Sequence, residues 1–349
     1  MNQTPFGNSK ASLFTLENGN GTRVTLTDVG ASIVGAVIVA KDGRPIDVVL
    51  GYDDPQAYFD CKSFFGATVG RVANRISGAA FTLGGERFLL EANDGGNTLH
   101  GGFSPYSNRL WEASEAGEAG NAVEFSLFSS DGDQGFPGDA RVRVRYALTD
   151  DDRIRIEYRA ETNKATPFNL TNHAYFNMDG HDAGPAAMAE QFLWLDCGRF
   201  TESDGSLITT GRLIDVEGTP LDFRLGRRIG DGLDADYGPL RLAGGYDHNF
   251  VVGASPGKPV ARLWSERSGL ELQVFTDMPG IQFYSGNHMT EEKGKDGAVY
   301  GYRGACCLET QFYPDSPNRP EFPSCVFEAG RPFVSVTEYR LVARQPRAE

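Results

Sequence analysis

Eleven residues from Pro167 to Asn177 combine groups that could bind a polar ligand or exchange a proton with it. The segment reads Pro-Phe-Asn-Leu-Thr-Asn-His-Ala-Tyr-Phe-Asn, with three asparagines, one histidine and three aromatic residues but no lysine, arginine or carboxylate. It is too polar for a core strand and too aromatic for a solvated loop, so we expect a strand end that lines a cleft. A histidine beside aromatic residues is more often structural than catalytic, so His173 alone does not indicate catalysis.

Glu309 is a second candidate for proton transfer. It lies in Leu308-Glu309-Thr310-Gln311-Phe312, where the apolar and aromatic residues predict a strand. A charge inside such a strand costs free energy unless it is paired or used. Burial raises the pKa of a carboxyl group, so Glu309 could act as a general base near neutral pH. On its own, the pattern fits a structural carboxylate equally well.

Three other segments carry groups suited to a polar ligand. Tyr246-Asp247-His248-Asn249 precedes a strand pattern, and its Asp247 and Asn249 are either turn formers or hydrogen-bonding partners for sugar hydroxyls. The stretch 64–75 has glycines that permit close backbone approach and two arginines spaced four residues apart. His100 lies in a loop with a glycine pair on each side.

Motifs for metals, cofactors and acyl hydrolysis are missing or incomplete. The five histidines, at positions 100, 173, 181, 248 and 288, form no H-x-H or H-E-x-x-H pair, and the histidine spacing of a cupin site is absent. A metal site would therefore have to be assembled in three dimensions. Residues 253–257 match G-x-S-x-G, but prolines follow where the nucleophile elbow requires a helix, so we expect a turn. We expect no metal and no cofactor.

Composition limits the partners and the compartment. The net charge of −14 and the pI of about 4.9 disfavour nucleic acid or an anionic membrane and favour a neutral or cationic ligand. Five cysteines without a C-x-x-C pair argue against a disulfide framework and favour a reducing compartment. The N-terminus has no signal-peptide pattern and no apolar run reaches membrane-spanning length, so we expect a cytoplasmic protein.

Short strands must position these groups. Apolar and polar residues alternate over 123–127, 141–146 and 154–158, which predicts antiparallel strands with one wet face. Further strands are expected over 24–27, 33–39, 192–195, 250–252, 261–266, 270–275, 280–284, 305–312 and 333–342. Asp42-Gly43 and Gly84-Gly85 predict hairpins, residues 225–233 a short helix, and the charged run 291–296 a solvated loop. The whole pattern predicts an all-β fold: a large antiparallel β-sandwich with few short helices, in one domain over residues 1–349.

Six motifs in order resemble those of the aldose 1-epimerases, the galactose mutarotases. They are Gly70–Ile76, Asn97–Gly102, Asn169–Asn177, Tyr246–Asn249, Gly280–Asn287 and Leu308–Gln311, and the agreement in order and spacing extends from about Gly19 to Val342. One departure is Met178, where the family more usually has Leu or Ile, and this is a conservative packing change.

The resemblance implies a galactose mutarotase-like supersandwich with an open cleft for an aldose. It also implies that His173 is the general acid to the ring oxygen and Glu309 the general base on the C1 hydroxyl, with His100 as a second catalytic histidine at that end of the sugar. The sugar-binding positions would be Asn74, Arg75, His100, His173, Tyr175, Asp247 and Gln282. For this chemistry we expect His173 near its ordinary pKa of about 6.5. No metal or cofactor is implied, and a monomer or a homodimer is expected.

Three alternatives stay open at this point. A hexose-6-phosphate 1-epimerase would need a basic cluster, for which Arg227-Arg228 is the best candidate, although it also suits a surface turn. A glycosidase could use Asp247 with Glu309 as its carboxyl pair. A non-catalytic carbohydrate-binding sandwich would explain the aromatic residues and amides, but it has no need for an imidazole and a glutamate in one cleft. The asparagines of residues 167–177 are expected to orient His173 rather than to touch sugar.

Overall fold

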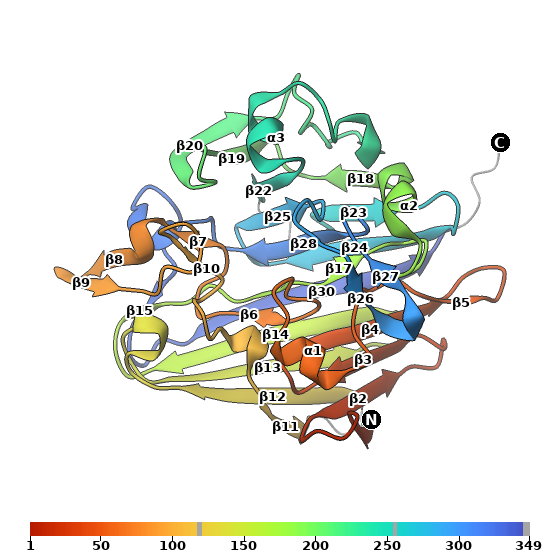
Figure 1. Ribbon diagram of the computed structural model, residues 1–349, viewed down its shortest axis with the longest axis horizontal. Coiled ribbons are helices and arrows are strands. Elements are labelled where there is room, and N and C mark those ends of the chain that lie inside the picture. Colours follow the sequence, from red (N-terminus) through yellow and green to blue (C-terminus); the bar gives the residue numbers. More distant parts are fainter. Residues whose placement is uncertain (117–120, 254–256, 345–349) are drawn as a thin grey trace.

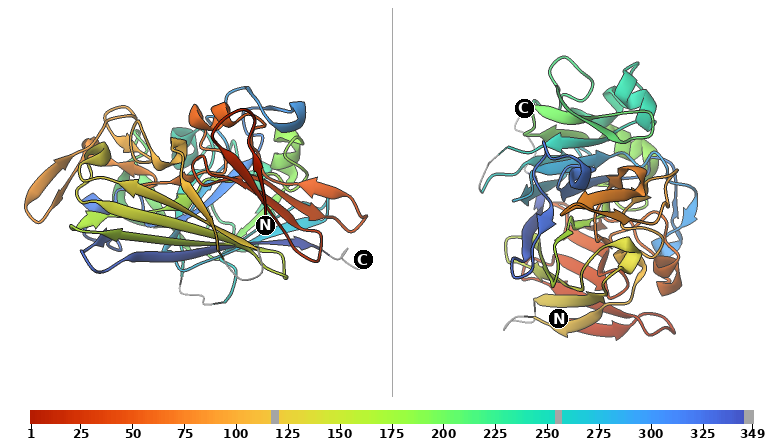
Figure 2. Two further views of the ribbon diagram at one scale, coloured as in Figure 1. Left: turned by 90° about the horizontal axis from the view of Figure 1, so that it is seen from below. Right: turned by 90° about the vertical axis from the view of Figure 1, so that its left-hand side faces the viewer.

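Three antiparallel sheets build the protein in two layers. The computed structural model describes residues 1–116, 121–253 and 257–344. Within these ranges the largest sheets have nine, six and five strands, and all their strand pairs are antiparallel. Figures 1 and 2 show the sheets stacked face to face. The predicted antiparallel sandwich is confirmed.

The nine-stranded sheet forms one layer. Its order is β11-β12-β13-β14-β30-β24-β23-β18-β21. The strands are β11 (Glu112–Glu115), β12 (Ala122–Ser129), β13 (Ala140–Leu148), β14 (Arg153–Thr162), β18 (Phe192–Leu195), β21 (Arg227–Arg228), β23 (Ala261–Trp264), β24 (Leu270–Thr276) and β30 (Phe333–Ala343). Along β13, Val142 and Val144 are buried while Arg141 and Arg143 are exposed. The period of two therefore places one face against the core and the other in water.

The six-stranded and five-stranded sheets form the second layer. The first contains β17 (Tyr175–Phe176), β19 (Arg199–Ser203), β20 (Thr209–Asp215), β22 (Asp247–Val251), β25 (Gly280–Tyr284) and β28 (Cys306–Gln311). The second contains β1 (Asn2–Pro5), β2 (Ser12–Glu17), β3 (Arg23–Thr27), β4 (Ser32–Val39) and β5 (Pro45–Asp47). The ring of Phe176 lies 5.1 Å from that of Tyr339 on β30, and Phe14 lies 5.4 Å from Phe125 on β12. One apolar core thus joins all three sheets; a single domain over residues 1–349 stays a prediction.

Short ladders and helices complete the fold. The two-stranded ladders are β6 (Thr68–Val69) with β16 (Thr171–Asn172), β7 (Arg75–Ile76) with β10 (Thr98–Leu99), β8 (Ala80–Leu83) with β9 (Glu86–Leu89), β15 (Thr166–Pro167) with β29 (Val326–Phe327), and β26 (Glu292–Lys293) with β27 (Val299–Tyr300). The α-helices within the described residues are α1 (Pro55–Phe59), α2 (Gly184–Glu190) and α3 (Gly238–Ala243). Single 3₁₀ turns are η1 (Ser77–Ala79), η2 (Tyr106–Asn108), η3 (Asp133–Gly135), η4 (Ile229–Asp231), η5 (Lys295–Gly297) and η6 (Ser316–Asn318). The expected few short helices and both hairpins are confirmed.

Two local predictions are wrong. Residues 225–233 form strand β21 and the single 3₁₀ turn η4 instead of an α-helix, because Arg227 and Arg228 pair with Leu193 and Phe192 of β18. The charged run 291–296 is not fully solvated. Lys295 is buried, and its Nζ donates to a carboxylate oxygen of Asp47 at 2.7 Å and to two main-chain carbonyls. These three acceptors compensate the ammonium group for the loss of water.

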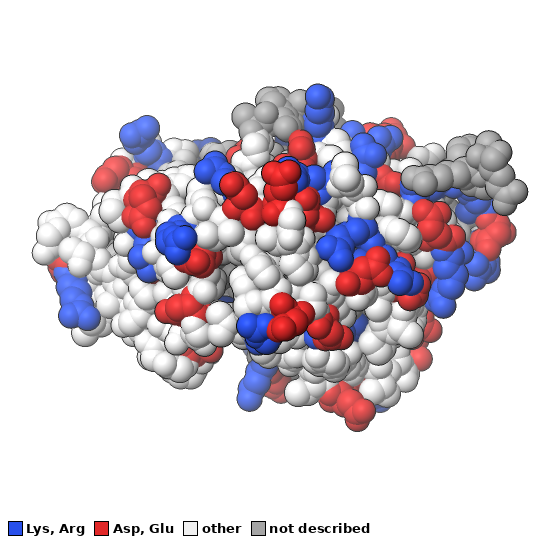
Figure 3. All heavy atoms as spheres, turned by 90° about the horizontal axis from the view of Figure 1, so that it is seen from above, with Lys and Arg blue, Asp and Glu red and all other residues white. Residues whose placement is uncertain are grey.

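Two further points concern the surface and the chain as a whole. No helix within the described residues is long and apolar enough to cross a membrane. On the face shown in Figure 3, acidic and basic side chains are interspersed. The turn expected at 253–257 falls largely outside the described residues, which omit 254–256.

Candidate active site

The six-stranded sheet has one apolar and one polar face, and the polar face carries the candidate site. On β28, Leu308 belongs to the apolar core, whereas its neighbour Glu309 lies on the opposite face. Glu309 is directly opposite Gln282 on β25, and Gln282 is opposite Asn249 on β22. Tyr175 on β17 is opposite Cys307. Strand pairing therefore brings together side chains that are more than 100 residues apart in sequence.

A second wall comes from the ladder of β7 with β10. The pairing of Arg75 with Leu99 places Asn74 beside His100. These two residues exchange hydrogen bonds, because the main-chain N–H of His100 donates to the carbonyl of Asn74 at 3.1 Å and the N–H of Asn74 donates to Nδ1 of His100 at 3.2 Å. Both have left-handed backbone, with φ values of 62° and 52°. Asparagine tolerates this conformation better than most residues.

All predicted site residues line one pocket of about 140 Å³. They are Asn74, Arg75, His100, His173, Tyr175, Asp247, Gln282 and Glu309. Lys62, Ser63, Phe64, Leu99, Tyr284, His288 and Met289 complete the lining. Sites for drug-sized ligands are larger, about 300–1,000 Å³. The pocket therefore suits a small polar ligand.

His173 and Glu309 form a close, buried pair. Nε2 of His173 lies 3.7 Å from Oε2 of Glu309, and both side chains are at most 5% exposed. This Oε2 atom has no hydrogen-bond partner among the described residues. Burial lowers the pKa of His173 to about 4, and burial together with the charge of Asp247 raises the pKa of Glu309 well above its ordinary value. The expectation of an ordinary imidazole pKa is wrong because His173 is shielded from water.

His100 is a neutral hydrogen-bond donor. Burial, and then the neighbouring His173 and Arg75, lower its pKa well below 6.5. Since Nδ1 accepts the N–H of Asn74, the ring proton of the neutral imidazole resides on Nε2. Its ring centroid lies 5.3 Å from that of His173. His100 can therefore donate to a ligand oxygen beside the acid/base pair.

The same arrangement disfavours a resident metal ion. Donor atoms of His100, His173 and Glu309 lie within 4.8 Å of one another, a spacing that could hold a metal. A metal ligand must offer a lone pair, however, and the one nitrogen lone pair of neutral His100 already accepts the Asn74 N–H. The donor set therefore does not fit a metal without the loss of that hydrogen bond.

Charged and amide groups around the pair are only partly used by the protein. Nε of Arg75 contacts a carboxylate oxygen of Asp94 at 2.8 Å, while its Nη groups make no hydrogen bond to described residues. Nε2 of Gln282 donates to Oδ1 of Asp247 at 2.5 Å. The second oxygen of Asp247 accepts no hydrogen bond from the part of the chain that the structure describes. These groups are free to bind a hydroxylated ligand.

The motif asparagines contact the protein instead of lining the pocket. The side chain of Asn172 donates to the carbonyl of Gly66 at 2.7 Å and accepts from the N–H of Ala174 at 3.1 Å. Asn169 accepts from the N–H of Phe312 at 2.8 Å. Asn177 donates to the carbonyl of Gly304 at 2.9 Å. All three are buried, so they tie the segment that carries His173, between β16 and β17, to neighbouring parts of the chain.

Comparisons with known proteins show the family to which the chain belongs. A family model described as aldose 1-epimerase matches residues 12–340. The aldose 1-epimerase of Escherichia coli strain K12 is 39% identical over 340 residues and covers 95% of each chain. The galactose mutarotase of Bos taurus is 37% identical over 339 residues, covering 97% of this chain and 96% of that one. The chain belongs to the aldose 1-epimerase family.

Solved structures of aldose 1-epimerase relatives share the fold. A GalM/aldose epimerase homologue from C. elegans superposes with a TM-score of 0.88 at 32% identity, covering 96% of this chain and 100% of that one. A galactose 1-epimerase from Lactobacillus acidophilus has a TM-score of 0.86 at 26% identity and 99% coverage of both chains. As a member of this family, the protein is an isomerase.

Some pocket residues of this aldose 1-epimerase chain were missed from sequence. Tyr284 lies in a quoted motif and follows Gln282 by two positions, so the strand period could have identified it. Lys62, Phe64 and Met289 lie in loops, where no periodic pattern places a side chain. Only the fold brings those loops to the pocket.

Proposed function

We propose that this protein interconverts the α and β anomers of free aldoses such as glucose or galactose. In this proposal His173 is the general acid to the ring oxygen, and Glu309 is the general base on the C1 hydroxyl. The observation that carries it is the unpartnered Oε2 of Glu309, 3.7 Å from Nε2 of His173 in a pocket lined by hydrogen-bonding groups. A buried carboxylate oxygen that has no hydrogen-bond partner and lies beside an imidazole is suited to proton exchange with a ligand.

The reaction needs no net gain or loss of protons or electrons. Glu309 removes the proton of the C1 hydroxyl while His173 delivers a proton to the ring oxygen. The C1–O5 bond breaks and the C1=O bond forms, which gives the open-chain aldehyde. After rotation about C1–C2, the same two groups run in reverse, and the ring closes on the other face of the carbonyl. Each positioned proton transfer contributes roughly 10²–10⁴-fold to the rate.

The pair carries a single proton at neutral pH. Burial favours a neutral imidazole and a protonated carboxyl, and we infer that this proton rests on Glu309 before substrate binds. Ring opening requires this proton on His173. We infer that sugar binding transfers the proton from Glu309 to His173. A C1 hydroxyl that donates to Glu309 stabilises the carboxylate, and the ring oxygen accepts a hydrogen bond from protonated His173. Ring opening then returns the pair to its resting protonation.

The other polar groups are assigned to sugar binding. We propose that Nε2–H of His100 donates to an oxygen at the reacting end, and that Arg75 stabilises charge that develops on oxygen there. Asp247 and Gln282 would bind hydroxyls at the far side of the ring. The lining positions of Asn74 and Tyr175 support contacts with sugar as well.

Two alternatives receive less support. Arg227 and Arg228, the candidates for a phosphate site, do not line the pocket, and Arg228 pairs with Glu190 and Asp231. This basic pair therefore gives no support for a hexose-6-phosphate substrate. In a non-catalytic sugar-binding protein, no function would offset the free energy that the burial of Glu309 costs the fold.

Polarimetry on freshly dissolved single anomers tests the proposal. We expect this protein to accelerate the mutarotation of α-glucose or α-galactose over the buffer rate, in proportion to enzyme concentration. Binding of these sugars without acceleration would refute the catalytic assignment. A panel with xylose and arabinose would identify the preferred aldose.

A further inference from the structure

Phe64 lies in the pocket wall with an unusual backbone. Its φ of 59° is left-handed, a conformation that is rare for a bulky residue and costs free energy. Strained residues of this kind persist only where their surroundings enforce them, and they cluster at functional sites. The strain is therefore a reason to ask what the Phe64 ring does.

The ring covers both imidazoles of the site. Its centroid lies 4.7 Å from that of His100 and 5.6 Å from that of His173. The two histidine rings lie 5.3 Å apart. The three rings thus form one contiguous cluster, with Phe64 the only member that cannot exchange a proton.

Neighbouring residues hold the loop in place on both sides. The next residue, Phe65, is fully buried and stacks on Tyr52 with ring centroids 5.0 Å apart. The N–H of Gly66 donates to the carbonyl of His173 at 3.0 Å. On the other side, Oγ of Ser63 donates to a carboxylate oxygen of Glu292 at 2.5 Å. Because Phe65 is anchored inward, the left-handed turn at residue 64 directs its ring toward the histidines.

We propose that Phe64 is a positioning residue that closes the pocket wall over His100 and His173 and keeps water away from the pair that moves the proton. This role rests on the proposed function of that pair. It explains why a strained aromatic residue is found at this position, since no small or polar side chain would cover both rings. The low pKa of His173, about 4 through burial, agrees with such shielding.

Other groups also act on the two imidazoles, and Phe64 must be tested against them. Glu309 and Cys307 face His173 from β28, Tyr175 and Tyr284 from β17 and β25, and Arg75 acts on His100. A substitution at residue 64 leaves all of these in place. A change in the titration midpoint of His100 or His173 would therefore report on how well the Phe64 ring shields the two imidazoles from water.

The test compares Phe64→Ala with Phe64→Leu and a control, Phe88→Ala. Phe88 is also half-buried and stacks on Phe81 at 5.3 Å, outside the pocket. NMR titration of the imidazoles should show the midpoint of His173 raised by about one pH unit or more in Phe64→Ala, since hydration favours the charged ring. Phe64→Leu should keep most of the low midpoint, and Phe88→Ala all of it. Unchanged midpoints of His100 and His173 in Phe64→Ala would overturn the proposal.

Kinetics separate this proposal from the proposed function. If both hold, the acid limb of kcat/KM in Phe64→Ala moves to higher pH by the same amount as the NMR midpoint. A moved midpoint with a fixed kinetic limb supports the role of Phe64 and counts against His173 as the acid.

A further pair of variants tests the strain. At ordinary positions alanine is more stabilising than glycine, but glycine adopts left-handed backbone freely. Phe64→Gly should therefore unfold at a higher urea concentration than Phe64→Ala. The opposite order would show that the left-handed backbone carries no strain, and would remove the argument that the position is held for function.

Discussion

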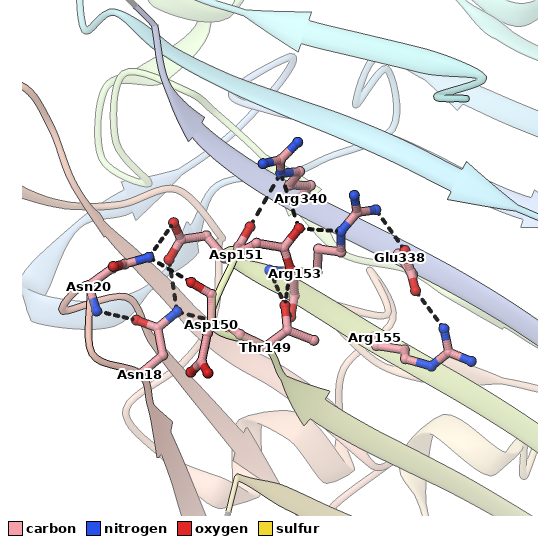
Figure 4. A network of polar contacts seen from close by, with 10 residues as sticks. Asn18, Asn20, Thr149, Asp150, Asp151, Arg153, Arg155, Glu338 and Arg340 are labelled. Carbon is pink, nitrogen blue, oxygen red and sulfur yellow. Dashed lines mark hydrogen bonds and ion pairs between the residues drawn. The ribbon is translucent and has the colours of Figure 1, made fainter. Parts of the chain in front are cut away.

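Two sheets of this protein carry charged residues on strands, with opposite consequences. On the outer face of the nine-stranded sheet, Glu338 of β30 accepts from Arg153 at 2.8 Å and from Arg155 at 2.6 Å (Figure 4). On the polar face of the six-stranded sheet, Glu309 has one oxygen without a partner and a histidine 3.7 Å away. Both residues are glutamates. They differ in their access to water and in the number of basic side chains that bind them. A glutamate with two arginines is structural, and a buried glutamate without them can react.

The pKa values express the same difference. Burial raises the pKa of Glu157 on the outer sheet, but hydrogen bonds and charges from Arg155 and Arg145 outweigh burial and hold it below its ordinary value. For Glu309, burial and the charge of Asp247 both act upward. Glu157 is therefore ionised at neutral pH, whereas the surroundings of Glu309 favour its protonated form.

The largest expected effect comes from breaking the inner pair. Glu309→Gln and His173→Asn should each lower kcat by roughly 10²–10⁴-fold, because each removes one positioned proton transfer. The matched control on the outer sheet is Glu338→Gln, which should keep the wild-type rate in polarimetry. Near-wild-type turnover in either inner variant would refute the acid/base assignment.

The pH dependence of kcat/KM should follow the single shared proton. When His173 is protonated as well as Glu309, no base is left to accept the proton of the C1 hydroxyl. The acid limb is therefore expected near pH 4, well below the ordinary imidazole range. Activity should then be flat through neutral pH and fall at high pH, when Glu309 loses the shared proton. An acid limb near pH 6.5 would mean that His173 is hydrated in solution.

The substitution Glu309→Gln should lower activity but raise the free energy of unfolding above pH 4.5. The folded-state pKa of Glu309 lies above the ordinary 4.5, so its contribution to stability is lost as pH rises above that value. Glu309→Gln does not titrate and should therefore gain stability relative to wild type as the pH rises above 4.5, by about 1.4 kcal/mol for each unit of raised pKa. Thermal unfolding at several pH values measures this. A difference independent of pH would show that Glu309 is ionised in the folded protein.

The smallest effect is expected on the outer sheet. Arg155→Ala removes one of two partners of Glu338 and should cost about 0.2–1 kcal/mol of unfolding free energy, less at high salt. Urea unfolding at low and high salt checks this. A cost of several kcal/mol would mean that the outer ion pairs stabilise the fold as strongly as buried ones.

The sequence predicted the strands well because their side chains alternate, as along β13, and because turns are marked by glycine, as at Asp42-Gly43. Glu309 was recognisable as a polar residue inside an apolar strand. Other features depend on contacts between distant segments. The exchange of hydrogen bonds between Asn74 and His100 requires two left-handed residues. The burial of Lys295 requires acceptors more than 240 residues away in sequence, and no local pattern indicates them.

The central claim is that burial without a basic partner leaves Glu309 protonated and able to share its proton with His173. Infrared difference spectroscopy of wild type against Glu309→Gln at pH 7 tests this most directly. The account predicts a protonated carboxyl C=O band that is present in wild type, absent in the variant and weakened when galactose binds. A spectrum in which Glu309 appears only as carboxylate, with or without sugar, would contradict it.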